Sequence, residues 1–378
     1  MQVKPGIAHW PMQAALLALA LGLAVLCQPA GQAQKKAQTT VAGTTAELIW
    51  PLPPAPPRVR WVGQVTDLDE VKAKTRKKRS WIDRVAGAKA TDEPDARLKR
   101  PYGIALDSQG RLYVADGFQR QVFVLDLIQH RVEVRGSAGQ ASLALPVGVA
   151  LDEKDRLFVS DSFWRSITCF DPNGRVLSQF GQEQLERPGG IAIDRKRQRL
   201  YVADAKAHRV AVFNTESFTF ERYVGSPSTP GVAEPGRFSA PTNVAVDAQG
   251  NLYVADTWNH RVQVFDRRGR HLRAFGTHGT RPGSFVRPKG IAVDSEGHIY
   301  VADAEFNNFQ IFTPDGVPLL SVGNLGNGPG QFTLIAGLYI DSQNRIYTTE
   351  QEGGRVQIFQ YVSQPKAAAG KEAGQPRN

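Results

Sequence analysis

The chain has 378 residues, of which 41% are hydrophobic and 22% are charged, as in an ordinary globular protein. The formal net charge of +10 lies in the flanking regions, because residues 101–362 hold 27 basic and 27 acidic side chains. A neutral main body argues against a nucleic-acid-binding protein, since phosphate binding needs clustered Lys and Arg without compensating acids.

The N-terminal residues have the pattern of a secretory signal. A lysine precedes an apolar run, Ala14–Cys27, that is too short to span a bilayer comfortably. Small residues up to Ala33 predict cleavage there, which makes residues 1–33 a signal peptide and the protein an exported one, periplasmic or extracellular. Cys27 offers an alternative, lipid anchoring of the mature chain, but the bulky Leu26 before it argues against such processing.

A Pro-rich segment at residues 34–57 and an insert at residues 66–100 precede the regular part of the chain. The insert carries the basic run Lys72–Arg79, which is typical of a solvated surface loop. The alternative is peripheral contact of this run with an anionic membrane surface or an acidic partner. Ser80 follows the run and is predicted to cap a short amphipathic helix.

Six copies of one pattern follow. The segment GIALDSQGRLYVAD (103–116) recurs at 148–161, 190–204, 243–256 and 290–303, and a weaker copy ends at Glu350. The acids that end the copies are 43 to 52 residues apart. Each unit contains four short alternating strands, which we call a to d, separated by turn residues. This period predicts an all-β fold, a six-bladed β-propeller of four-stranded antiparallel blades that spans residues 58–362.

The sixth unit lacks a strand d of its own, because the chain continues there as the polar tail 363–378, which is predicted to be disordered. Residues 58–65 (RVRWVGQV) resemble the strands d of the other units. We therefore predict that they pair beside strand c of the last blade. This pairing closes the ring and protects an open sheet edge.

Strand a begins with a small residue in every unit. The position holds five glycines and one asparagine: Gly103, Gly148, Gly190, Asn243, Gly290 and Gly337. Since Asn tolerates the left-handed region best after Gly, this pattern predicts a positive φ. A proline stands two positions earlier in five units and stiffens the chain as it approaches the central channel.

Two acids recur in each unit and are predicted to be structural. Strand a ends at Asp107, Asp152, Asp194, Asp247, Asp294 and Asp341, where the carboxylate is expected to accept hydrogen bonds from the following turn. Strand b ends at Asp116, Asp161, Asp204, Asp256, Asp303 and Glu350. An Arg or His often follows the second acid by four or five positions, so we predict a b–c turn in which the acid binds both backbone and base.

These residues resemble the NHL repeat, and DTWNHRV (256–262) is close to its ideal form. The resemblance covers about residues 58–362, and the Pro-rich segment before them is similar to that of secreted bacterial NHL-repeat proteins. The resemblance to the NHL repeat implies a six-bladed propeller. It implies no single function, because one fold can serve many functions.

Two enzymatic branches of this fold use a channel metal. The resemblance to peptide-amidating lyases implies zinc-binding histidines just after the proline before strand a. Those positions hold Tyr102, Val147, Gly189, Thr242, Lys289 and Ala336. His208 and His260 remain, but two ligands do not complete a three-histidine site. Lactonase-like relatives use a Glu, two Asn and an Asp, and Asn243 is the only amide at the corresponding mouth. No catalytic residue, metal ligand or cofactor is therefore assigned.

The b–c turns carry aromatic and basic residues that the turn itself does not require. The predicted binding residues are Phe118, Arg120, Phe163, Trp164, Arg165, His208, Trp258, His260 and Phe306. Trp, Tyr and Arg dominate the energetics of binding surfaces. The sequence thus predicts a monomeric, exported recognition platform that binds a protein or small-molecule ligand on the face of the b–c and d–a loops. Packing of these rings over neighbouring blades, and a metal-dependent lyase or lactonase-like enzyme at the channel, are the alternatives.

Overall fold

The computed structural model describes residues 47–73, 97–137, 142–229 and 234–362. The predicted signal peptide, the helix after Ser80 and the C-terminal tail lie outside these residues. The chain divides into two units, residues 1–45 and 46–378, and every described residue belongs to the second. No described helix has the length and apolar character that a membrane span requires.

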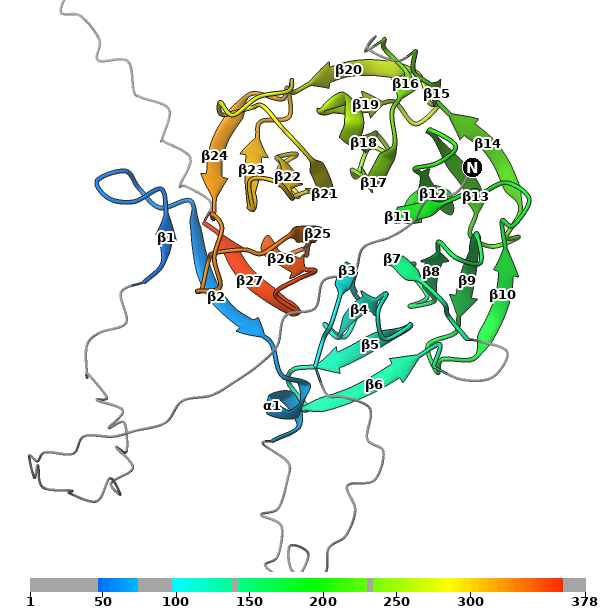
Figure 1. Ribbon diagram of the computed structural model, residues 1–378. Coiled ribbons are helices and arrows are strands. Elements are labelled where there is room, and N and C mark those ends of the chain that lie inside the picture. Colours follow the sequence, from blue (N-terminus) through cyan, green and yellow to red (C-terminus); the bar gives the residue numbers. More distant parts are fainter. Residues whose placement is uncertain (1–46, 74–96, 138–141, 230–233, 363–378) are drawn as a thin grey trace, which may run out of the picture. The chain divides into compact units, whose positions relative to one another are not determined.

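The described strands form six blades arranged around a channel (Figure 1). Blade 1 consists of β3 (Pro101–Leu106), β4 (Leu112–Asp116), β5 (Gln121–Asp126) and β6 (Arg131–Arg135). Blade 2 consists of β7 (Pro146–Leu151), β8 (Leu157–Asp161), β9 (Ser166–Phe170) and β10 (Val176–Phe180). Blade 3 consists of β11 (Pro188–Asp194), β12 (Arg199–Asp204), β13 (Arg209–Asn214) and β14 (Phe220–Val224), with the 3₁₀ helix η2 (Arg195–Arg197) between β11 and β12.

Blades 4 and 5 repeat this plan. Blade 4 consists of β17 (Pro241–Val246), β18 (Leu252–Asp256), β19 (Arg261–Phe265) and β20 (His271–Phe275), with η3 (Thr257–Asn259) in its b–c turn. Blade 5 consists of β21 (Pro288–Val293), β22 (Ile299–Asp303), β23 (Asn308–Phe312) and β24 (Pro318–Val322). The short strands β15 (Ser226–Pro227) and β16 (Arg237–Phe238) pair in parallel between blades 3 and 4.

Blade 6 joins the two ends of the described chain. It consists of β25 (Ile335–Ile340), β26 (Arg345–Glu350) and β27 (Arg355–Tyr361), and β2 (Val59–Val65) pairs antiparallel with β27. The predicted closure by residues 58–65 is thus confirmed. A fifth strand that the sequence did not indicate, β1 (Ile49–Trp50), pairs with β2. Strand β25 also lies beside β3, so the six innermost strands form a closed circle.

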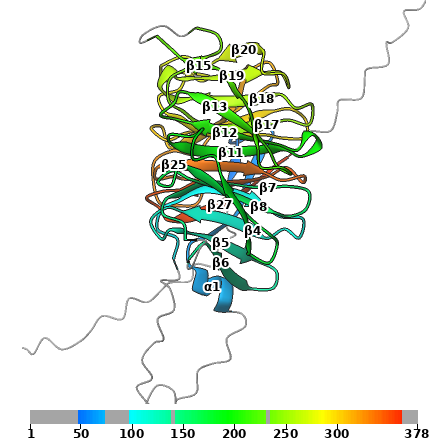
Figure 2. The same ribbon diagram turned by 90° about the vertical axis from the view of Figure 1, so that its right-hand side faces the viewer.

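The hydrophobic core is divided into layers between the blades. Six apolar clusters occur among the described residues, and each combines side chains from two neighbouring blades. Strand b is buried along its whole length in blades 1, 2, 4 and 5, and after its first residue in blades 3 and 6, because neighbouring blades cover both of its faces. Helix α1 (Leu68–Ala73) lies against β6 at the outer edge of blade 1, and its Leu68 joins the layer between blades 6 and 1 (Figures 1 and 2).

The predicted reason for the glycines at the start of strand a is wrong. None of the five glycines has a positive φ. A Cβ on Gly337 would instead stand 1.9 Å from Tyr102 O, and one on Gly290 would stand 2.7 Å from Ala336 O. In blades 1, 2, 5 and 6 the position excludes a side chain because adjacent strands a converge on the channel and their backbones approach closely. In blade 4 the position holds Asn243, whose side chain occupies the space beside Gly190.

The acids at the ends of strands a act as predicted. Asp107 Oδ1 accepts the backbone N–H of Gln109 (3.0 Å) and of Arg111 (2.9 Å). Its Oδ2 accepts from Arg111 Nε (2.6 Å) and from the hydroxyl of Tyr113 (3.3 Å). The same tyrosine contact recurs from Tyr253, Tyr300 and Tyr347 to their own blade's aspartate. These carboxylates therefore stabilise the a–b turns.

Candidate functional site

Each b–c turn is a four-residue loop whose preceding acid is completely buried. Asp161 Oδ2 accepts the backbone N–H of Ala144 (2.7 Å) from the d–a connection. Asp161 Oδ1 accepts the backbone N–H groups of Phe163 and Trp164, both at 3.0 Å. The acid thereby joins the b–c turn to the adjacent d–a connection, and it fixes the turn without using any side chain of the turn itself.

The fourth residue of each b–c turn has a left-handed backbone. It is Arg120, Arg165, His208, His260, Asn307 or Gly354, with φ between 52° and 58°. The predicted bond between acid and base is confirmed at the fifth position after the acid, where Arg261 pairs with Asp256 and Arg355 with Glu350. At the fourth position the prediction is wrong, since within the described ranges none of these side chains is bonded to its own blade's acid. Asn307 and Gly354 are the residue types that best tolerate a left-handed backbone, so their presence in this set could have predicted the conformation of the position.

The two predicted histidines bind neighbouring blades. His208 Nδ1 accepts the backbone N–H of Ala240 (2.9 Å) at the start of blade 4. His260 Nδ1 lies 2.8 Å from Val286 O, a group that only accepts, so Nδ1 donates to it. Both imidazoles are partly buried. These contacts support a role in holding adjacent blades together.

The predicted aromatic residues extend into solvent on the b–c face. The exposed fraction is 69% for Phe118, 64% for Phe163, 49% for Trp164 and 60% for Trp258, whereas Phe306 is partly buried. Phe163 and Trp164 pack edge to face with ring centroids 4.9 Å apart. The rings therefore do not serve mainly as packing between blades.

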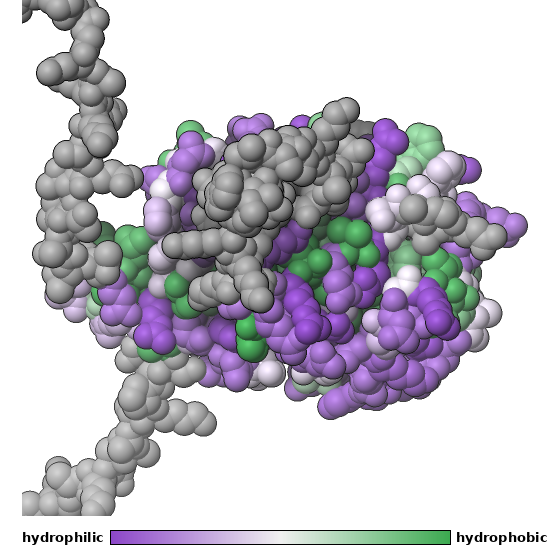
Figure 3. All heavy atoms as spheres, turned by 90° about the horizontal axis from the view of Figure 1, so that it is seen from below, coloured by the Kyte–Doolittle hydropathy of each residue, from purple (hydrophilic) through white to green (hydrophobic). Residues whose placement is uncertain are grey.

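Four apolar side chains and two arginines form what we call the blade 1–2 patch: Phe118, Leu145, Phe163, Trp164, Arg120 and Arg165. Leu145 was not predicted from the sequence. It lies between the two b–c turns, because its carbonyl accepts the N–H of Ser162 (3.0 Å) and a Cβ on Gly117 would be 3.1 Å from its Cδ1. Leu145 is 43% exposed and both arginines are exposed. The described surface visible in Figure 3 is mostly hydrophilic, with hydrophobic side chains scattered over it.

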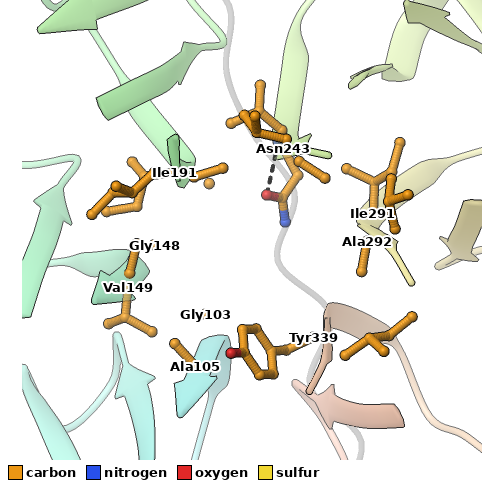
Figure 4. A pocket seen from close by; sticks show the side chains of 18 of the residues that line it. Gly103, Ala105, Gly148, Val149, Ile191, Asn243, Ile291, Ala292 and Tyr339 are labelled. Carbon is orange, nitrogen blue, oxygen red and sulfur yellow. Dashed lines mark hydrogen bonds between the residues drawn. The ribbon is translucent and has the colours of Figure 1, made fainter. Parts of the chain in front are cut away.

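A cavity of about 420 Å³ occupies the channel. Two residues after the small residue of strand a, five blades place an alanine and blade 6 places Tyr339 (Figure 4). Burial raises the pKa of the Tyr339 phenol, while the nearby Arg195 opposes this effect. The Asn243 amide oxygen accepts the N–H of Val244 (2.9 Å). The channel is therefore lined mainly by apolar side chains, with Glu153 and Arg195 among the polar residues at its a–b end.

Tyr102, Thr242 and Lys289 lie one residue before the small residue of strand a, between the cavity and the b–c face. We call them the mouth cluster. The Tyr102 side chain is hydrogen-bonded to Thr242 of the opposite blade, and burial raises its pKa to about 12. Lys289 Nζ stands 5.7 Å from the centroid of the Tyr102 ring and donates to Gln351 Oε1 (3.2 Å). Burial, reinforced by Arg287 and Arg100, lowers the pKa of Lys289 to about 8.

A catalytic metal, which the enzymatic branches would require, does not fit the described side chains. Within the described ranges, no three His, Cys, Asp or Glu side chains are grouped so that they could hold a metal ion. The acids of the a–b and b–c turns are engaged by their own turns, and the two histidines contact backbone groups of neighbouring blades. No reaction step through a metal is derived.

Comparison with known proteins matches three segments, residues 185–213, 238–265 and 285–313, to the NHL repeat. The chain is 53% identical over 51 residues to protein brain tumor of Drosophila melanogaster, which is 14% of this chain and 5% of that protein. It is 34% identical over 114 residues to peptidyl-glycine alpha-amidating monooxygenase B of Xenopus laevis, which is 29% of this chain and 13% of that protein. The matched segments thus span only a small part of these relatives.

Solved structures similar to this chain include two enzymes. A virginiamycin B lyase from Staphylococcus aureus superposes with a TM-score of 0.53 at 12% identity, covering 70% of this chain and 96% of the lyase. A gluconolactonase from Xanthomonas campestris superposes with a TM-score of 0.54 at 16% identity, covering 80% of this chain and 98% of that one. At such low identity the likeness shows the propeller fold alone.

Proposed function

Because the chain is a six-bladed β-propeller that contains NHL repeats, we propose that it is a non-enzymatic recognition platform. The blade 1–2 patch would bind a polypeptide partner. The observation that carries this proposal is the exposure of Phe118, Phe163 and Trp164 on turns whose geometry is already fixed by buried aspartates. Solvent-exposed rings that no turn requires are the residue type that dominates binding energetics.

A rigid display reduces the cost of binding. Asp116 and Asp161 fix the backbone of the two b–c turns, so binding orders only side chains. Each immobilised side chain costs roughly 0.5–1.5 kcal/mol, which is less than the cost of ordering a mobile loop as well. The patch is therefore suited to a partner that places one or two apolar side chains between the exposed rings.

The charge of the patch indicates an acidic partner. Arg120 and Arg165 are exposed beside the rings, and within the described ranges neither forms an ion pair. Arginine can bind a carboxylate through two parallel hydrogen bonds and also stack on aromatic rings. The partner segment would combine an apolar anchor with Asp or Glu. Since residues 1–33 have the pattern of a signal peptide, we place this partner in the periplasm or outside the cell.

The alternative is a metal-dependent lyase or lactonase-like enzyme at the channel. Its support is the fold likeness to such enzymes and a partial sequence match to an amidating enzyme. The described channel residues supply mainly aliphatic side chains. The recognition platform is the better supported function.

The test uses a photo-crosslinking phenylalanine analogue in the full chain, expressed in its own cells. The analogue replaces Trp164 in one variant and Ile128, which is 82% exposed on the c–d turn of blade 1, in a control. We expect an acidic protein to be crosslinked at position 164 and not at 128. Adding Phe118→Ala and Arg120→Ala to the first variant should reduce the crosslink. Equal crosslinking at both positions, or none, would reject the proposal.

A further inference from the structure

The mouth cluster buries a positive charge that lacks a counterion among the described residues. Lys289 is partly buried, and the side chains recorded near its ammonium are the neutral Tyr102 and Gln351. The charged groups that act on it are Arg100 and Arg287, and both repel it. Burying an ammonium beside two guanidinium groups is costly unless an anion accompanies it.

One of the two guanidinium groups is compensated by an acid. Glu305 Oε2 lies 3.1 Å from Arg287 Nη2, so this carboxylate compensates the guanidinium. Arg100 is exposed, and within the described ranges it forms no ion pair. The Lys289 ammonium therefore remains an uncompensated positive charge in the cluster, and the exposed Arg100 adds a second positive charge nearby.

The ammonium faces the b–c side of the ring. Gln351, which accepts its hydrogen bond, is the first residue of the b–c turn of blade 6. On the other side the Tyr102 ring lies within about 6 Å of Nζ, the range of a cation–π contact, and its hydroxyl is bonded to Thr242 across the channel. A ligand therefore reaches Lys289 from the b–c face and not through the apolar cavity.

We propose that the mouth cluster is a carboxylate-binding site in which Lys289 Nζ donates to the ligand's carboxylate and Arg100 adds a second attraction. An ammonium has three donors, and Gln351 uses one of them. A singly charged carboxylate neutralises the one buried excess charge without introducing another. The site is independent of the blade 1–2 patch, and it accepts a carboxylate from a free small molecule or from an acidic polypeptide.

The test measures the reactivity of individual lysines in the full chain toward 1-fluoro-2,4-dinitrobenzene, with mass spectrometry of the labelled peptides. Only a neutral amine reacts, so labelling across pH reports the pKa of each lysine. At constant ionic strength and pH 8, propionate is compared with the uncharged propionamide. We expect propionate to slow the labelling of Lys289 about fivefold, because a pKa raised from 8 to 9 lowers the neutral fraction from about a half to about a tenth.

Two controls separate site binding from bulk effects. Lys154, which pairs with Glu216, should label at the same rate with either probe, since a carboxylate already compensates it. Arg100→Met should weaken protection of Lys289 by propionate. A C-terminally amidated tetraglutamate peptide is the second probe: protection by it assigns the site to acidic chains, and protection by propionate alone assigns it to small acids.

The proposal is overturned if neither carboxylate probe slows labelling of Lys289 more than propionamide does. Phe118→Ala with Trp164→Ala should leave this protection unchanged. No specific crosslink at position 164 of the otherwise unchanged chain, with protection of Lys289 intact, would reject the proposed partner surface alone. A specific crosslink at position 164 without protection of Lys289 would reject the carboxylate site alone.

Discussion

Arg261 Nε donates to Asp256 Oδ2 at 2.9 Å, and both side chains are buried. The guanidinium also donates to the carbonyls of Glu234 and Arg237, both at 2.8 Å, in the connection between blades 3 and 4. Blade 6 repeats the pair with Arg355 and Glu350 at 2.6 Å. In the motif DTWNHRV, which has the residue types of an active site, the arginine therefore joins strands and the histidine joins blades.

Arg261→Met should strongly destabilise the fold. The substitution keeps much of the side-chain volume but leaves the Asp256 carboxylate buried without its cation, which typically costs about 3–5 kcal/mol. Arg165→Met removes an arginine at the preceding turn position, where the side chain is exposed, and should change the free energy of unfolding by less than about 0.5 kcal/mol. Urea unfolding measures both. Similar losses in the two variants would show that the buried pair is not the stabilising contact.

Gly337→Ala should be damaging although the residue has no positive φ. The added Cβ would stand 1.9 Å from Tyr102 O, so the first and last blades must move apart at the channel, at a cost of roughly 1–3 kcal/mol or more. Gly63→Ala in β2 is the matched control, because nothing lies within 4 Å of its added Cβ. Thermal unfolding should separate the two variants clearly. A tolerated Gly337→Ala would contradict close packing of the inner strands.

Much of the fold could be predicted from the chain. The 43 to 52-residue period and the alternation within each unit indicate blades and their number, and the missing last strand indicates how the ring closes. The conformations at the repeated positions were harder to predict. Gly337 is small because another blade's backbone approaches it, and that contact does not exist within one repeat.

Sequence could predict only those residues of the candidate site whose position depends on a single local turn. Phe118 and Trp164 are exposed because the local turn points them outward. Leu145 and the mouth cluster depend on neighbouring or opposite blades. Lys289 stands at a position where the resemblance to amidating lyases implied a metal-binding histidine. Its surroundings are formed by other blades, which supply Tyr102 and Gln351.

The stability of the protein should depend on Lys289 in the alkaline range. Its pKa is about 8 in the fold and about 10.4 when unfolded, so between these values the unfolded chain binds more protons and stability rises with pH. Lys289→Met removes this contribution. Between pH 8 and 10 the wild type should therefore gain stability relative to the variant, and below pH 8 their difference should be constant. Urea unfolding at several pH values tests this, and a constant difference throughout would contradict the lowered pKa.

Cys169 should be inert in the folded protein. Its side chain is fully buried, and burial raises the pKa of the thiol to about 12, so almost no thiolate exists at pH 8. A chain that begins at residue 34 contains no other cysteine. Dithionitrobenzoate should react with it only as fast as the protein unfolds, and at once in 6 M guanidinium, roughly the condition that unfolds most domains. Rapid reaction without denaturant would show that blade 2 opens locally.

Removal of the closing strand should unfold the ring. A chain that begins at residue 58 retains β2 and its pairing with β27, including the contact of Trp61 Nε1 with Gln357 Oε1 at 3.0 Å. A chain that begins at residue 66 exposes the edge of β27 and the buried cluster around Phe359. We expect the first to unfold cooperatively and the second to aggregate or bind a hydrophobic dye. Equal behaviour would mean that β2 is dispensable.

The pairing of β2 with β27 also sets the order of events during synthesis. Val59 is made early, but its partner Tyr361 emerges about three hundred residues later. At translation rates of about 5–20 residues per second, the closing strand β2 waits for tens of seconds. During that time the edge of β2 that later pairs with β27 is open, and it must be kept from associating with other chains. Blades 1 to 5 can form as they emerge, whereas the circle is completed only after β27 has been made.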